Sequence, residues 1–265
     1  MLLILSANSL RGKVLAKKGP LPLLDLPRFA REQTELHGLM MPTGLFAGAD
    51  AKAIDRFRDE ADKAECPCLV LVEDEPQDIG STEDRFEAAL DRVSRVLKAG
   101  QRLGCNAVGA PIVATENEDK YELIAARTRR LLDRADRLQI NLLLVPAKGI
   151  TSTPEGMTGL IKKVGGFRIG SLPDFEQAST LGPDITDTLR KIVPYASAVI
   201  ASAGDLDSKG KHKPYDLDKC MDALLAVGYD ALVAVEYRGK GDPAEGVRAI
   251  KQALEASIEA AANKG

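Results

Sequence analysis

The stretch Ala231-Leu232-Val233-Ala234-Val235 is apolar at every position and is followed at once by an acidic residue, Glu236. A strand with one face in water alternates apolar and polar residues, whereas a run without alternation is typical of a strand that is covered on both faces. The stretch therefore predicts a strand in the buried wall of a parallel sheet, with a carboxylate near its carboxyl end.

Similar apolar runs recur along the chain, and a polar loop and an amphipathic segment separate each from the next. This order predicts parallel strands that are connected by helices. Eight such units and 265 residues fit an α/β fold, the (β/α)8 TIM barrel, which typically needs about 250 residues. No linker rich in Pro, Ser or Gly divides the chain, so we expect a single domain over residues 1–265. The expected strands are 2–6, 38–41, 68–72, 107–113, 140–145, 167–172, 198–201 and 231–235.

Composition limits the class of partner. Apolar residues make up 45% of the chain and charged residues 28%, with a net charge of -3, so a nucleic acid or an anionic membrane is not expected as a partner. The apolar start, 1–5, lacks the basic region of a signal peptide, and no stretch approaches the roughly 18 apolar residues of a membrane span. We expect a cytoplasmic protein, with a homo-oligomer as one option.

The four cysteines are Cys66, Cys68, Cys105 and Cys220. Only the first two lie close together, and Cys-Pro-Cys lacks the two intervening residues of common redox and zinc motifs. We interpret all four as small apolar fillers.

Candidate site residues follow from the fold, because the reactive groups of such barrels come from the carboxyl ends of the strands. A ring of carboxylates there could hold a divalent cation through oxygen ligands. The alternative is that these carboxylates are charged loop residues that face water. We favour this alternative for every carboxylate except Glu236 and Asp174. A carboxylate as deep as Glu236 costs several kcal/mol unless it is paired or binds a metal. The polar residues just past the expected strands are Asn8, Glu73, Glu75, Glu116, Asn117, Lys148, Asp174, Ser202, Asp205, Glu236 and Arg238.

Two basic features add candidates. The loop after the seventh expected strand contains Lys209, Lys211 and His212, close to where such barrels often bind phosphate, although a solvated basic loop is equally open. Lys148 follows the fifth expected strand, where it could donate a hydrogen bond to a developing oxyanion.

Several motifs together resemble those of the xylose isomerase-like barrels, a family that includes sugar phosphate isomerases and epimerases and endonuclease IV. Residues 227–236 resemble the closing G-Y-D-x-x-x-x-x-E motif of that family. Thr153-Pro154-Glu155 resembles its T-P-E helix start, and Ile169-Gly170 with Asp174 resembles its G-x-x-x-D. The resemblance is good over residues 103–254 and implies the same barrel fold.

The resemblance also implies a metal site, from which this sequence departs. The positions that match the family's four metal ligands hold Val145, Asp174, Ser202 and Glu236, so two of the four are not ligands. The family's pair of catalytic glutamates is then incomplete, unless Glu116, Glu73 or Asp205 substitutes. With only His37 and His212 in the chain, the histidine-rich zinc site of endonuclease IV cannot be built.

The favoured interpretation is a sugar or sugar-phosphate isomerase or epimerase that transfers a proton next to a carbonyl of a small polyhydroxy substrate. A non-catalytic barrel that binds a carbohydrate or has a regulatory role is the main alternative, and metal-dependent phosphoester hydrolysis is a third. One divalent metal, Mn, Mg or Zn, is a candidate cofactor, and Val145 and Ser202 argue against it. The expected catalytic residues are Glu236, Lys148 and Glu116; the expected metal ligands are Asp174 and Glu236; the expected substrate-binding residues are Arg238, Lys209, Lys211, His212, Asn8, Glu73 and Ser202.

Overall fold

The computed structural model describes residues 1–114, 120–182 and 184–263. Within these ranges eight parallel strands form one curled sheet in the order β7-β6-β5-β3-β2-β1-β9-β8, which confirms the predicted barrel. A two-residue strand, β4 (Gln77–Asp78), lies off this path and pairs with β5. The eight strands are β1 (Leu2–Ser6), β2 (Leu39–Pro42), β3 (Cys68–Val72), β5 (Ala107–Val113), β6 (Asn141–Val145), β7 (Ile169–Ser171), β8 (Ala198–Ala203) and β9 (Leu232–Tyr237).

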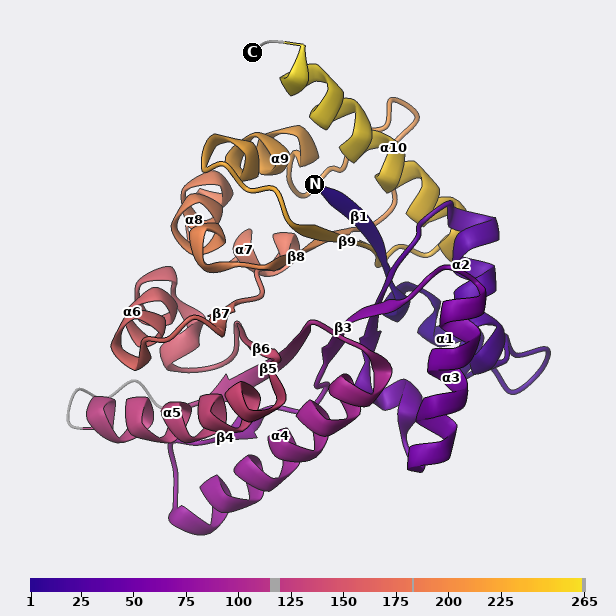
Figure 1. The fold of residues 1–265 in the computed structure, drawn as a ribbon. Helices are drawn as coiled ribbons and strands as arrows, with labels where there is room; N and C mark the ends of the chain where they lie inside the picture. The colour runs from indigo at the N-terminus through magenta and orange to yellow at the C-terminus, as the bar shows by residue number, and fades with distance from the viewer. Residues whose placement is uncertain (115–119, 183, 264–265) are drawn as a thin grey trace.

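Helices surround the outer face of this sheet (Figure 1). Their apolar sides pack on the strands as the helical spacing of the sequence predicts. Side-chain caps begin several of them; Thr153 accepts from the Gly156 N–H, and Asp242 accepts from the Ala244 and Glu245 N–H groups. The helices are α1 (Arg11–Val14), α2 (Leu26–Thr34), α3 (Ala51–Lys63), α4 (Glu83–Leu103), α5 (Tyr121–Leu138), α6 (Pro154–Val164), α7 (Phe175–Ala178), α8 (Ile185–Ile192), α9 (Leu217–Ala226) and α10 (Pro243–Ala262).

The barrel interior has its own apolar cluster, separate from the core between sheet and helices. Ile4, Leu143 and Ala234 belong to this inner cluster. Because alternate residues of a strand share a face, the residues two positions further on also face inward, nearer the carboxyl ends. By this alternation β9 directs Glu236 into the barrel and β6 directs Val145 there.

The barrel closes weakly between β7 and β8. The two strands meet only at isolated bridges among the described residues, Ser171 with Ala196 and Asp174 with Ile200. The Ile200 N–H donates to the Pro173 carbonyl at 2.8 Å across this seam. Asp174 therefore lies beyond the end of its strand, as the expected strand 167–172 predicts.

The segment 10–22, which follows the first residues after β1, begins with helical turns. A 3-10 turn (Ala7–Leu10) leads directly into α1, and the Leu21 N–H donates to the Lys13 carbonyl at 3.0 Å. The first residues after β1, including Asn8, are thereby held close to the barrel mouth.

All four cysteines are free and buried, as small apolar fillers would be. The Sγ atoms of Cys68 and Cys105 lie 3.3 Å apart. Burial raises the pKa of the Cys66 thiol and that of the Cys220 thiol to about 12, so neither is a reactive thiolate at neutral pH.

Among the described residues, no helix combines the length and apolar character that crossing a membrane requires.

Candidate functional site

A cavity of about 400 Å³ opens at the carboxyl ends of the strands. Its floor is apolar, with Met40, Val72, Val145 and Ile200 among the lining residues. Polar side chains line the rest of it, namely Ser6, Asn8, Glu73, Asp74, Lys148, Asp174, Gln177, Glu236 and Arg238. We call this space the mouth cavity.

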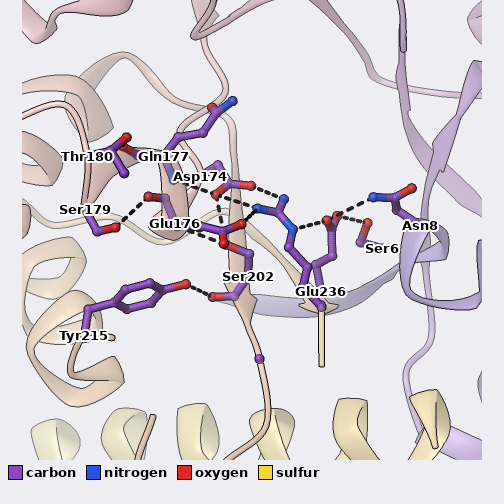
Figure 2. A network of polar contacts seen from close by, with 12 residues as sticks. Ser6, Asn8, Asp174, Glu176, Gln177, Ser179, Thr180, Ser202, Tyr215 and Glu236 are labelled. Carbon is purple, nitrogen blue, oxygen red and sulfur yellow. Dashed lines mark hydrogen bonds and ion pairs between the residues drawn. The ribbon is translucent and has the colours of Figure 1, made fainter. Parts of the chain in front are cut away.

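Glu236 lies inside β9 rather than past its end, and its side chain is 3% exposed. The Ser6 hydroxyl donates to Oε2, while Asn8 Nδ2 donates to Oε1 at 3.1 Å. Arg238 Nε donates to the same Oε1 at 2.7 Å. Figure 2 shows Ser6 and Asn8 beside the Glu236 carboxylate, so that both of its oxygens accept hydrogen bonds.

Asp174 lies across the mouth cavity at the seam, and its side chain is 4% exposed. The Ser202 hydroxyl donates to its Oδ1 at 2.9 Å, and the Gln177 N–H donates to the same oxygen at 3.1 Å as a cap of α7. Burial raises the pKa of Asp174, because together with the negative charge of Glu236 it outweighs the attraction of Arg238.

The guanidinium of Arg238 joins these two carboxylates. Besides Nε on Glu236, Nη1 and Nη2 donate to Oδ1 and Oδ2 of Asp174, and Nη1 also donates to Glu176. Burial alone would lower the pKa of Arg238, but the charges of Glu236 and Asp174 raise it well above its ordinary value. The side chain is therefore a permanent cation at the centre of the site.

Glu73 lines another part of the mouth cavity and pairs with Arg92, a partly exposed side chain that lies outside the cavity lining. Glu73 is 2% exposed, and Arg92 donates to it from Nε at 2.7 Å and from Nη2 at 3.1 Å. The neighbouring Asp74 pairs with Arg11 at 2.7 Å and accepts the Gly44 N–H at 2.8 Å. Glu73 is therefore already paired, which argues against it as a replacement base.

Lys148 lies at the edge of the mouth cavity with an exposed side chain. Within the described ranges it forms no ion pair with a carboxylate. Two other expected site residues, Glu116 and Asn117, lie outside the described residues.

Ser202 is fully buried and lines no part of the mouth cavity. Its hydroxyl accepts the Glu176 N–H at 3.0 Å and donates to Asp174, and the Tyr215 hydroxyl donates to its carbonyl at 2.6 Å. The geometry makes Ser202 a support for Asp174, and its burial argues against the predicted contact with a substrate.

The basic loop after β8 lies away from the mouth cavity. Lys209 and Lys211 line a different cavity of about 610 Å³ beside α10, and Lys211 forms an ion pair with Asp218. Asp205 lines this second cavity too, which removes it as a replacement base at the barrel mouth.

His212 is buried beneath that loop. Its Nε2 accepts the Gly204 N–H at 3.0 Å, and Nδ1 lies 3.3 Å from the Tyr215 carbonyl oxygen. Burial lowers the pKa of His212, in agreement with a neutral ring whose Nδ1 carries the proton. Lys209, Lys211 and His212 do not line the mouth cavity, so their role in substrate binding stays a prediction.

The structure adds residues to the site that the sequence patterns do not single out. They are Ser6, Asp74, Arg92, Glu176 and Gln177. One signal was available, since Ser6 lies two positions after Ile4 and so shares its inward face. The contacts of Arg92 and Glu176 depend on pairing between distant segments and have no local signal.

A family model described as a xylose isomerase-like TIM barrel matches residues 33–259. The chain belongs to this family. The resemblance of the sequence motifs is thereby confirmed, and the mouth cavity is that of a xylose isomerase-like barrel. No curated protein matches the chain.

Solved structures similar to this xylose isomerase-like barrel include sugar epimerases. An L-ribulose 3-epimerase is 16% identical with a TM-score of 0.81, over 100% of this chain and 97% of that one. A 3-keto-D-glucoside 4-epimerase from E. coli is 16% identical with a TM-score of 0.77, over 97% and 99%. The IOLI protein, whose structure contains a zinc atom, is 15% identical with a TM-score of 0.71, over 97% and 96%. At these identities the similarity establishes the fold alone.

The residues that the structure describes at the mouth cavity do not fit a divalent cation. Among the described residues, no group of three or more His, Cys, Asp or Glu side chains could hold a metal. Asp174 and Glu236 both lie at the mouth cavity, but Arg238 occupies three of their four carboxylate oxygens, and Ser6 occupies the fourth. Val145 offers no donor atom, and the Ser202 hydroxyl is already bonded to Asp174.

Proposed function

We propose that this barrel binds a small sugar or sugar phosphate in the mouth cavity and transfers a proton next to the carbonyl of that ligand. The observation that carries the proposal is the convergence of Glu236, Asp174, Arg238, Asn8 and Lys148 on one cavity of about 400 Å³. That volume suits a small ligand. Carboxylates accept from sugar hydroxyls, while amide, ammonium and guanidinium groups donate to sugar oxygens. The names of the similar epimerases agree with a sugar as the ligand.

Glu236 is the proposed base, because its carboxylate faces the mouth cavity from β9. It would remove the proton from the carbon next to the carbonyl, and the carbonyl oxygen would become an enediolate oxygen. Lys148, at the cavity edge, would donate to that developing oxyanion, and Asn8 would orient the substrate.

Val145 restricts the stereochemistry of such a reaction. It faces the cavity from β6 and cannot act as a second base. A single base can return the proton to the neighbouring carbon only on the face from which it came. If the hydroxyl proton of that carbon passes to the former carbonyl oxygen, the carbonyl shifts between the two carbons and no proton is gained or lost. Inversion at one carbon needs a donor on the opposite face. Because Val145 stands where the family has its second glutamate, we propose aldose–ketose isomerisation rather than epimerisation, as far as the described residues of the cavity go.

One observation favours a second candidate, binding without turnover. Both oxygens of Glu236 already accept hydrogen bonds, from Ser6, Asn8 and Arg238. A base must free one oxygen to reach a substrate proton, so a ligand that leaves these bonds intact would be bound but not converted.

Ligand-observed NMR in D2O tests both candidates with a panel of aldoses, ketoses and their phosphates. We expect one ligand to bind and to take up deuterium next to its carbonyl, and Glu236→Gln to retain binding but lose the exchange. Binding without exchange would establish the second candidate. Absence of binding across the panel would overturn the proposal.

A further inference from the structure

We propose that Arg238 is a built-in cation of the mouth cavity: it holds Asp174 and Glu236 so that the pair takes up no divalent ion, and it offers an N–H donor to an oxygen of the ligand. The second part rests on the proposed function, whereas the first part stands without it.

Arg238 already occupies most of the carboxylate oxygens of this pair. Oδ1 and Oδ2 of Asp174 and Oε1 of Glu236 all accept hydrogen bonds from Arg238. A metal ion bound between the same two side chains would need those same oxygen lone pairs. The guanidinium and a divalent ion therefore exclude each other.

The two carboxylates also need a positive charge beside them. Asp174 and Glu236 carry side chains that are 4% and 3% exposed and face one small cavity. Two buried carboxylates repel each other and need a positive partner. Arginine cannot lose its proton in a protein, so Arg238 supplies that charge at every physiological pH.

Arg238 is held in place from several sides. Its backbone N–H donates to the Ala203 carbonyl at 2.8 Å, which anchors it to β8. Two positions separate it from Glu236, so both side chains leave the same face of the chain. Glu176 from α7 also accepts from Nη1. The cation is thus placed by three separate elements.

Arg238 also has an N–H group that can serve a ligand. A guanidinium has five N–H groups, and the described residues accept from four of those of Arg238. The fifth belongs to Nη2, and the Arg238 side chain lines the mouth cavity. A carbonyl or hydroxyl oxygen of a sugar can accept this hydrogen, and the positive charge stabilises the oxygen if it becomes negative.

The experiment removes the cation and measures binding of Mn²⁺ by electron paramagnetic resonance of the free ion. We expect the wild-type protein to bind no stoichiometric Mn²⁺. Arg238→Ala should bind one ion, with a dissociation constant at least about tenfold below that of any residual binding to the wild type. The gain should be lost in Arg238→Ala/Asp174→Asn. Arg238→Lys should also show no gain, because a lysine retains a positive charge beside the carboxylates.

Arg92→Ala is the matched control. It also removes an arginine from a buried carboxylate at the mouth cavity, Glu73. Among the described residues, however, Arg92 pairs with Glu73 alone, so its removal leaves one carboxylate and not a pair. It should therefore gain no Mn²⁺ binding. An equal gain in Arg92→Ala would show that any vacated carboxylate binds the ion and would overturn the special role of Arg238.

Two further outcomes overturn the proposal. One is stoichiometric Mn²⁺ binding by the wild type that Asp174→Asn abolishes, since the guanidinium would then not exclude the ion. The other is a folded Arg238→Ala protein without a gain in Mn²⁺ binding. If Arg238→Ala does not fold alone, refolding with Mn²⁺ or with methylguanidinium should restore folded protein, and failure of both would also count against the proposal. None of these measurements requires sugar turnover, so a failed isomerase assay leaves them intact.

The proposed N–H donation from Arg238 to the ligand is tested separately, by the affinity for the sugar that the NMR panel identifies. Arg238→Lys should weaken that binding about tenfold, because a lysine cannot keep both carboxylates and still direct an N–H into the cavity. Unchanged affinity in this variant would show that Arg238 donates no hydrogen bond to the ligand. The exclusion of divalent ions would not be affected by that result.

Discussion

Arg238 is the residue whose loss should affect stability most at the mouth cavity. Arg238→Ala leaves Asp174 and Glu236 buried without a positive partner, and breaking such a pair typically costs about 3–5 kcal/mol. We expect urea unfolding to show a loss of about 3 kcal/mol in the free energy of unfolding. Adding Glu236→Gln should recover part of that loss, since it removes one of the two charges. Equal stability of the single and double variants would contradict the electrostatic origin.

A second residue-scale prediction concerns His212 and pH. Its pKa in the folded protein lies below the ordinary 6.5, because its ring is buried. As the pH falls below 6.5, the unfolded chain takes up this proton first, so the stabilising contribution is complete above that pH and is lost below it. We expect the melting temperature to fall between about pH 7.5 and about pH 5.5, and to fall by about 2 °C less in His212→Gln. His37→Gln, at an exposed histidine, is the control, and an identical fall in all three proteins would refute the assignment.

Single residues also show how far the sequence leads. The inward direction of Glu236 follows from strand alternation, since it lies two positions after a residue of the inner cluster, Ala234. The same rule places Arg238 on the face of Glu236, so that part of the ion pair could have been predicted. The bond from Arg238 to Asp174 could not, because 64 residues separate the two and only the closed barrel brings them together.

At the scale of elements, the strands are the best predicted features. Continuous apolar runs gave the bounds of β1, β3 and β5 as the structure has them. The end of β9 was missed by two residues, because Glu236 and Tyr237 break the apolar pattern while still in the sheet. Neighbouring strands supply the hydrogen bonds that keep such polar residues extended, and this support is invisible to a local pattern.

The cap of α6 provides an element-scale prediction. Thr153 Oγ1 accepts the Gly156 N–H at 3.1 Å and satisfies one of the free donors of the first turn. Thr153→Ala should lower the free energy of unfolding by about 1 kcal/mol, and Thr153→Ser should restore most of it. Chemical denaturation measures both. Thr158→Ala, which removes a hydroxyl inside the same helix, should cost less, and a larger loss there would argue against the cap.

At the scale of the whole molecule, the proposed site and the weakest part of the barrel coincide. The seam between β7 and β8 has two isolated bridges, whereas β8 and β9 are in register over six residue pairs. Asp174 takes part in one of these bridges and also contacts Arg238. The bonds that order the mouth cavity therefore also help to close the barrel.

Hydrogen exchange can test this coupling between site and closure. The Ile200 N–H crosses the seam to Pro173, while Ala234 lies between β1 and β8. We expect the Ile200 amide to exchange faster than the Ala234 amide, because local opening of the seam breaks few bonds. Ser202→Ala removes a hydroxyl that bonds Asp174 and the Glu176 N–H, so it should accelerate exchange at Ile200 about fivefold and leave Ala234 unchanged.

Ser94→Ala is the control for that measurement, since the one hydrogen bond of its hydroxyl among the described residues lies within α4, to the Leu90 carbonyl. It should alter neither amide. A ligand in the mouth cavity that contacts Asp174 or Arg238 should in turn slow exchange at Ile200, because it stabilises the closed seam. Equal acceleration of both amides in Ser202→Ala would mean that the barrel opens as one unit. The contacts of the site would then not stabilise the seam between β7 and β8 in particular.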